Sequence, residues 1–342
     1  MNVVRPDWII MKESSEIFDT HAHLCDAAFD DEREAIIADL GAHGVGAFTE
    51  IGFDLPSSRA ALALAERYPQ VYAAVGFHPD HSDHLREEDV ETLRQMVEND
   101  RLQADESSLQ GEHRRNPVNS DVDKSVAVSP SAAVEASSVV EKRADIRKKI
   151  VAIGEIGLDY HYTREGILRR AAASGQEPDP ESLATAEPEP EIQKACFRRM
   201  LRLARALGLP INVHSREAAQ DTYDLIVEER GYENSGIIHC FGYPVEMAER
   251  FVKLGLYVGV GGVVTFKNSR KLKEVVERIP IERIVLETDC PYMAPVPKRG
   301  TRNDPRNLPY VVEEIAALRQ MDPAEVIRIT TENAKRVYRI SE

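Results

Sequence analysis

The sequence has few aromatic residues and few cysteines. Aromatic side chains make up 6% of its 342 residues, with a single tryptophan. The cysteines form no C-x-x-C pair, so there is no sign of a disulfide framework or of a cysteine-held zinc site. They number four: Cys25, Cys196, Cys240 and Cys290. We interpret them as small buried thiols in a reducing compartment, and therefore expect a cytoplasmic protein.

Long hydrophobic runs are also absent. No window approaches the roughly 18 consecutive apolar residues that a membrane-spanning helix needs. The first 16 residues include Arg, Asp, Lys and Glu, so they do not resemble a signal peptide. We expect a soluble protein with no membrane partner.

Positive charge is in deficit, since 43 Lys and Arg stand against 58 Asp and Glu, a formal net charge of −15. This balance argues against a protein that wraps long nucleic acid through a broadly basic surface. It does not exclude binding of a strand end at bound cations, which can be the largest local charges in a site. The contents of 42% hydrophobic and 30% charged residues exclude a disordered chain, a collagen and a coiled coil.

Short apolar runs rich in Val and Ile alternate with helical patterns. Continuous apolar runs of this kind are typical of parallel strands covered by helices. We expect strands at residues 17–21, 45–51, 71–75, 150–156, 210–213, 236–239, 256–260 and 283–287. We expect helices at residues 30–43, 57–68, 87–99, 191–207, 217–229, 245–254, 270–279, 309–319 and 323–338. Eight such units predict a (β/α)8 barrel, with a doubly wound open sheet as the main alternative.

Two segments interrupt this alternation. Residues 102–148 show no sustained period, and residues 163–190 contain prolines that deny a helix its backbone donors. We interpret both as insertions, the second more simply as a solvated loop than as a lid. The predicted single domain then spans residues 1–342, with a core of about 16–101, 149–162 and 191–342.

Candidate metal ligands stand at the C-terminal ends of five predicted strands. An H-x-H pair ends the first strand, and because strand side chains alternate, its two imidazoles and Asp19 share one face. Asp19 is a candidate to orient one of these rings. The full set is His21, His23, Glu155, His214, His239 and Asp289. Four imidazoles and two carboxylates exceed what one metal needs and suit two metals that share a bridging carboxylate.

Nine sequence motifs, given below, occur in an order that resembles the TatD family of metal-dependent deoxyribonucleases. The members of this family are barrels of the amidohydrolase type. The resemblance covers nearly the whole chain outside the two insertions, which are its main departure. The motifs are residues 18–24, 75–79 (VGFHP), 152–160 (AIGEIGLDY), 210–216, 238–241, 262–268, 286–295 (LETDCPYMAP), 297–303 (PKRGTRN) and 330–337 (TTENAKRV).

Carried over by position, the resemblance implies one metal at His21 and His23 and a second at His214 and His239. Glu155 would bridge the two metals. Asp289 would bind the first metal and take the proton of the attacking water. The implied activity is two-metal hydrolysis of DNA phosphodiester bonds, as a 3′→5′ exonuclease acting on single strands or strand ends, with Zn²⁺, Mg²⁺ or Mn²⁺ as the cation.

Substrate contacts are expected at the mouth of the barrel. The loop after the eighth strand supplies three cations suited to phosphate oxygens, Lys298, Arg299 and Arg302. His78, after the third strand, and Arg216, two residues beyond His214, are further candidates, although Arg216 equally suits a structural salt bridge.

Two other functions remain open from the sequence. The first is a hydrolase of the same architecture that acts on a small ester or amide, or on an aminoacyl ester of tRNA. Glu155 stands where many such barrels carry a modified lysine, which disfavours this reading. The second is a metal-holding scaffold, although an open two-metal centre serves no purpose there.

Overall fold

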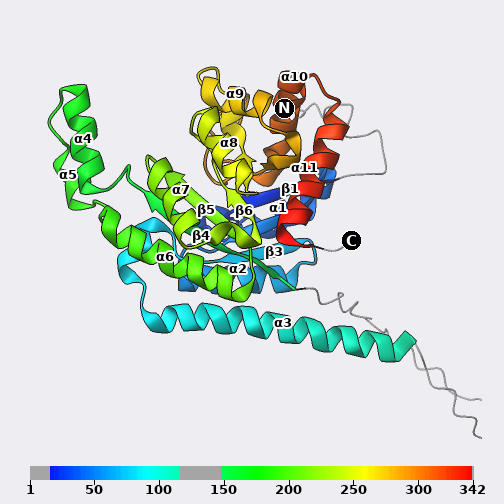
Figure 1. Ribbon diagram of the computed structural model, residues 1–342. Helices are drawn as coiled ribbons and strands as arrows, with labels where there is room; N and C mark the ends of the chain where they lie inside the picture. The colour runs from blue at the N-terminus through cyan, green and yellow to red at the C-terminus, as the bar shows by residue number, and fades with distance from the viewer. Residues whose placement is uncertain (1–15, 116–147, 341–342) are drawn as a thin grey trace, which may run out of the picture.

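The structure, a computed structural model, describes residues 16–115 and 148–340, with the side chains of residues 106–115 excepted (Figure 1). Eight strands form one parallel sheet in the order β1 to β8. Their bounds are β1 Ile17–Ala22, β2 Val45–Ile51, β3 Val71–Val75, β4 Ile150–Asp159, β5 Ile211–Arg216, β6 Gly236–Ile238, β7 Tyr257–Val260 and β8 Ile284–Leu286. Each lies at or within a few residues of a predicted strand.

The sheet closes where the chain beyond β8 meets β1. The backbone N–H of Asp289 donates to the carbonyl of His21 at 2.8 Å, and that of His23 donates to the carbonyl of Cys290 at 3.1 Å. A parallel bridge between Ala22 and Cys290 completes the junction. The predicted (β/α)8 barrel is therefore confirmed, and the open sheet is excluded.

Helices cover the outside of the barrel (Figure 1). They are α1 Arg33–Asp39, α2 Leu55–Arg67, α3 Glu87–Arg115, α4 Arg164–Ser174, α5 Pro180–Ala184, α6 Pro190–Leu207, α7 Ala219–Glu228, α8 Val245–Lys253, α9 Arg270–Arg278, α10 Leu308–Arg319 and α11 Pro323–Tyr338. Among the described residues, none of these helices combines the length and apolar character that a membrane crossing requires.

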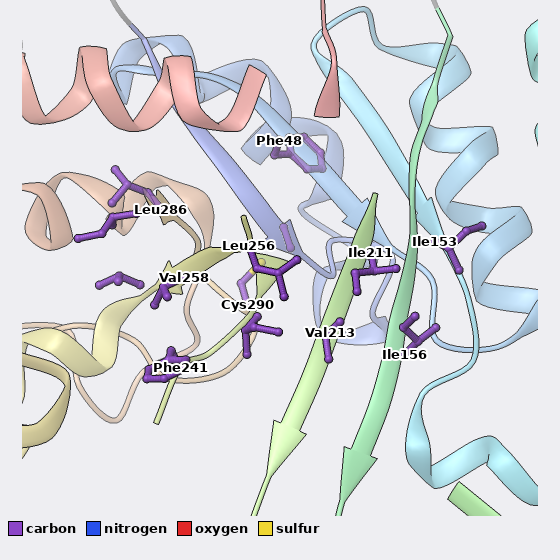
Figure 2. Close-up of a cluster of buried hydrophobic side chains, with 14 of the residues drawn as sticks. Phe48, Ile153, Ile156, Ile211, Val213, Phe241, Leu256, Val258, Leu286 and Cys290 are labelled. Atoms are coloured by element: carbon purple, nitrogen blue, oxygen red, sulfur yellow. The ribbon is translucent and has the colours of Figure 1, made fainter. Parts of the chain in front are cut away.

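The main core gathers side chains from most of the strands and from the helices packed on them. Figure 2 shows Phe48 of β2, Ile153 of β4 and Ile211 of β5 among them, and the sulfur of Cys290 lies in the same cluster. Cys196 is buried too, as expected, whereas Cys25 and Cys240 are only partly buried. All four thiols are free.

The first predicted insertion begins too early. Residues 102–115 continue α3, which starts at Glu87 and extends well beyond the barrel as a single long helix (Figure 1). The helical pattern is hard to recognise because the sequence of this stretch is mostly polar and sets no clear apolar period. The rest of that insertion, up to residue 147, lies outside the described residues.

The second insertion is not a structureless loop. It folds into α4 and α5, which project together from the barrel (Figure 1). The Thr163 hydroxyl caps α4 by accepting from the N–H of Gly166, and the Asp179 carboxylate caps α5. Pro180 and Pro190 stand at the first positions of α5 and α6, where a missing N–H breaks no helical hydrogen bond. The expectation that these prolines prevent a helix is therefore wrong, because they stand where a helix begins.

Candidate metal centre

The six predicted ligands meet at the C-terminal end of the barrel. β1 carries His21, with His23 just beyond it, and β4 and β5 carry Glu155 and His214. His239 follows β6, and Asp289 follows β8. Parallel strands bring their carboxyl ends to the same rim, which is why residues so far apart in the sequence come together.

Glu155 lies at the centre of the cluster, with each carboxylate oxygen directed to a different pair of imidazoles. Its Oε1 lies 2.7 Å from His239 Nε2 and 3.0 Å from His214 Nδ1. Its Oε2 lies 3.4 Å from His21 Nε2 and 3.7 Å from His23 Nε2. The carboxylate therefore joins two separate groups of nitrogen donors.

Asp289 belongs to the group around the H-x-H pair. Its Oδ1 lies 3.6 Å from His23 Nε2 and 3.8 Å from His21 Nε2, and those two nitrogens are 3.1 Å apart. One carboxylate oxygen and two imidazole nitrogens thus converge beside Glu155. On the other side of Glu155, His214 Nδ1 and His239 Nε2 are 3.1 Å apart.

A glycine lets β4 and β5 approach at this point. Gly157 is paired with His214 in the sheet and has a φ of +148°. A Cβ there would lie 1.9 Å from the carbonyl oxygen of His214, so any larger residue would push the two strands apart.

The carboxylates of the cluster are held in the ionised form. Burial opposes the charge of Glu155, but the imidazoles of His239, His78 and His21 outweigh it and hold its pKa well below the usual range. Burial likewise opposes the charge of Asp289, whereas hydrogen bonding with His23 keeps its pKa low. Both are thus available as anionic ligands.

The pKa values of the imidazoles are shifted in opposite directions. Burial disfavours the charged ring of His23, yet Asp289 and Glu155 outweigh it and raise the pKa to about 9. For His214, Asp159 and Glu155 likewise outweigh burial and raise the pKa to about 10. For His239, burial and the neighbouring His21 lower the pKa to about 4. Without a cation, protons on two of these rings balance the central carboxylates.

This donor set fits divalent cations. One ring nitrogen each of His21 and His23 and one carboxylate oxygen of Glu155 lie within 4.8 Å of one another. One ring nitrogen each of His78 and His214 and one carboxylate oxygen of Glu155 do so as well. Buried imidazole and carboxylate groups of this kind suit Zn²⁺ and Mn²⁺, and a cation would take the place of the ring protons.

Three further groups orient the rings. Asp159 Oδ2 lies 3.0 Å from His214 Nε2, the nitrogen that faces away from Glu155. Asn212 Oδ1 lies 3.3 Å from His21 Nδ1, and the carbonyl of Ile51 lies 3.1 Å from His23 Nδ1. Such partners fix which ring nitrogen faces the metal. Sequence reasoning missed Asp159, although it ends the same strand as Glu155 and could have been found as a second carboxylate there.

Asp19 does not orient an imidazole ring, contrary to our expectation. Its carboxylate accepts the backbone N–H of His21 at 3.1 Å and of Thr288 at 3.0 Å, as well as the Thr288 hydroxyl at 2.6 Å. The Asp19 carboxylate thus accepts three hydrogen bonds, two from backbone N–H groups and one from a hydroxyl. Asp19 therefore fixes the backbone of β1 against the segment after β8, and Asn212 takes the orienting role at His21.

The predicted substrate residues lie in different settings. His78 lies at the site, with Nε2 3.7 Å from Glu155 Oε1 and Nδ1 2.6 Å from Asp80. The Arg216 guanidinium covers the ring of Tyr162 at 4.8 Å, and that of Arg299 covers Phe266 at 4.4 Å.

Arg302 is already engaged within the protein. It pairs with Glu32 at 2.8 Å, donates to the carbonyl of Ala28 and lies over the ring of Phe29. It therefore holds the loop after β8 against the segment after β1. Lys298, in the same loop, is involved in no ion pair that the described residues show.

Comparisons with known proteins identify the family. The sequence model of the family described as "TatD related DNase" matches residues 18–105 and 117–339. The chain is 34% identical over 325 residues to the metal-dependent hydrolase YabD of Bacillus subtilis, covering 95% of this chain and 100% of that protein. It is 30% identical over 322 residues to the metal-dependent hydrolase TatD of Mycobacterium tuberculosis, covering 94% and 97% of the two chains.

A solved structure has the same fold. The structure of YjjV, a TatD homolog from Escherichia coli, superimposes with a TM-score of 0.69 at 25% identity, covering 95% of this chain and 98% of that one. The barrel, its ligand cluster and the near full-length family match lead to one conclusion. The chain belongs to the family of TatD-related DNases.

Proposed function

We propose that the protein hydrolyses phosphodiester bonds in DNA with two divalent cations, as a 3′→5′ exonuclease acting on single strands or strand ends. Its family membership makes it a metal-dependent hydrolase. The proposal adds the number of cations, the substrate and the direction of digestion.

One observation carries the proposal. The two oxygens of Glu155 face two separate imidazole pairs, His21 with His23 and His214 with His239. A carboxylate between two nitrogen pairs is the arrangement that a bridged two-metal centre requires. Asp289 would complete the first centre, and Asp159 would keep His214 in place for the second.

The residues of the chain divide the chemistry between them. Two divalent cations would supply Lewis-acid polarisation of a phosphate oxygen and a lowered pKa for the attacking water. Asp289, ionised and partly exposed, accepts the proton of that water through its carboxylate. His78, beside Glu155, is placed to donate a hydrogen bond to a phosphate oxygen.

The cations at the rim position the strand. Lys298 and Arg299 lie on the loop after β8, and Arg216 ends β5 beyond His214. Few basic residues near one deep centre favour the binding of one strand end over the wrapping of a duplex. The net charge of −15 is compatible with this mode of binding.

The test is a nuclease assay on single-stranded DNA labelled at either end, with Mg²⁺, Mn²⁺ or Zn²⁺ added to protein stripped by a chelator. We expect mononucleotides to be released first from the 3′ end, only with metal, and not by the Glu155→Ala variant. Release from the 5′ end would overturn the polarity. Turnover of lactones or of aminoacyl-tRNA esters without any cleavage of DNA would overturn the substrate and favour the small-ester alternative.

A further inference from the structure

Two buried polar atoms beside the metal centre have no hydrogen-bond partner among the described residues, His239 Nδ1 and Glu287 Oε2. A buried polar group without a partner is costly and calls for an explanation. His239 uses its other nitrogen, Nε2, toward Glu155 at 2.7 Å. Its Nδ1 is therefore the ring atom left for an orienting partner.

Glu287 lies near His239, beyond hydrogen-bond distance in this structure. One carboxylate oxygen of Glu287 lies within 4.8 Å of a ring nitrogen of His239 and of one of His21. The rings of those two histidines are stacked, with their centroids 3.9 Å apart and 12° between their planes. The side chain of Glu287 thus lies beside the stacked pair, and the residue is 1% exposed.

The position of Glu287 is built into the fold. Its Oε1 accepts the backbone N–H of Cys240, the residue directly after His239, at 2.5 Å. Its Oε2 lies against Gly259, where an added Cβ would come within 2.2 Å of that oxygen. Glu287 Oε1 is thus bonded to the segment that carries His239, whereas Oε2 has no hydrogen-bond partner among the described residues.

We propose that Glu287 is a positioning residue for His239, whose Nδ1–H donates to Glu287 Oε2 when Nε2 binds a cation. This inference rests on the proposed metal-binding role of His239. The other three histidines of the cluster each have such a partner, namely Asn212 for His21, the Ile51 carbonyl for His23 and Asp159 for His214. Glu287 gives the fourth ring the same kind of support, which fixes its tautomer and its orientation.

The first test is made on the unaltered protein. Zn²⁺ is added to the metal-free protein labelled with ¹⁵N-histidine, and the ring N–H signals are recorded by NMR. We expect an Nδ1–H signal of His239 that is shifted downfield and exchanges slowly with water, and that His239→Ala removes. A His239 whose Nδ1–H exchanges freely with water in the Zn²⁺-loaded protein would overturn the inference.

The second test uses Glu287→Gln and measures Zn²⁺ affinity by competition with a chelator. In Gln an NH2 group replaces one of the two carboxylate oxygens, so one of the two N–H groups, that of Cys240 or that of His239, faces a donor instead of an acceptor. We expect two Zn²⁺ to bind, one of them about 10- to 100-fold more weakly than in the parent. Gly259→Ala, which displaces the carboxylate without removing it, is expected to weaken the same step.

Glu50→Gln is the matched control. Glu50 is also buried, but its oxygens accept the backbone N–H groups of Leu24 and Cys25 at 2.8 and 2.7 Å, and His23 Nδ1 already faces the Ile51 carbonyl. We expect its loss to affect stability while leaving the second Zn²⁺ step unchanged. If the parent and Glu287→Gln bind Zn²⁺ with equal affinity, the positioning role of Glu287 is wrong but the proposed metal centre stands. If the parent binds no Zn²⁺, both are wrong.

Discussion

The two ends of β4 each depend on a buried aspartate, but the two aspartates contact different partners. At the N-terminal end, the Asp100 carboxylate of α3 accepts the backbone N–H groups of Lys149 and Ile150 at 3.0 Å. At the C-terminal end, Asp159 accepts the N–H of His161 and also contacts the ring of His214.

This difference appears in the pKa values. Burial raises the pKa of Asp100, because the backbone amides that contact it only partly compensate. Burial also opposes the charge of Asp159, but the ring of His214 outweighs it and lowers the pKa. The same residue type, at two ends of one strand, therefore fixes the backbone in one place and holds the ring of a proposed metal ligand in the other. Variants at the two ends of β4 should separate these two roles.

The largest effect on activity is expected from a substitution toward the C-terminal end of β4. Glu155→Ala removes the carboxylate that joins the two imidazole pairs, so hydrolysis should fall by about 10³-fold or more. The melting temperature of the metal-free protein and its circular dichroism spectrum serve as the folding control. A variant that folds and cleaves at the parent rate would show that Glu155 holds no essential cation.

Asp159→Asn tests the orienting role at the same end. The amide retains the shape but loses the charge that holds His214, so the affinity for one cation should fall by about 10- to 100-fold. Metal titration of the purified variant measures this directly. An unchanged affinity would mean that Asp159 only shapes the loop that begins at Tyr160.

Asp100→Ala tests the structural end. It removes the carboxylate that accepts the backbone N–H groups of Lys149 and Ile150 at the start of β4, which should cost about 1–3 kcal/mol of unfolding free energy. Urea denaturation followed by fluorescence or circular dichroism measures the loss. We expect kcat and metal affinity to stay at parent values, and a selective loss of activity in a fully folded variant would contradict the separation of the two ends.

The pH dependence of stability follows from the imidazoles. The pKa values of His23 and His214, about 9 and about 10, lie above the ordinary value of 6.5. A raised folded-state pKa contributes stability that is fully present below about 6.5 and is lost as pH rises through 9 to 10. The metal-free protein should therefore melt at lower temperature as pH rises across this window. Because cations compete with these protons, the increase in melting temperature on adding Zn²⁺ should grow over the same window.

The smallest effect is expected from the projecting helices α4 and α5. Residues 165–185 carry four acidic and two basic side chains near the mouth. The chain on either side is already joined, since Thr163 and Glu187 form a bridge. Replacing this stretch by a short Gly-Ser turn should lower KM for single-stranded DNA about twofold at low ionic strength and leave it unchanged at high salt. A singly charged small phosphodiester, whose KM should not change, is the control.

The sequence was sufficient for the barrel and for the convergence of the six candidate ligands, because both follow from strand ends. Val- and Ile-rich runs marked each strand, and His21, His214 and Asp289 stood where such runs stopped. The polar part of α3 could not be recognised, since its mostly polar sequence sets no clear apolar period. The partners that come from other strands could not be recognised either, because the contact of Asn212 with His21 depends on how the sheet closes.

The closure of the barrel has a consequence for the life of the polypeptide. The first imidazole pair and Asp289 come from opposite ends of the chain and are joined by the backbone bonds between β1 and the segment after β8. During synthesis, a ribosome-bound chain that has not yet emerged past Asp289 has no complete first centre. If these residues hold a cation as proposed, the first centre is completed only after the segment beyond β8 has docked on β1, and the proposed two-metal activity would follow the closure of the barrel.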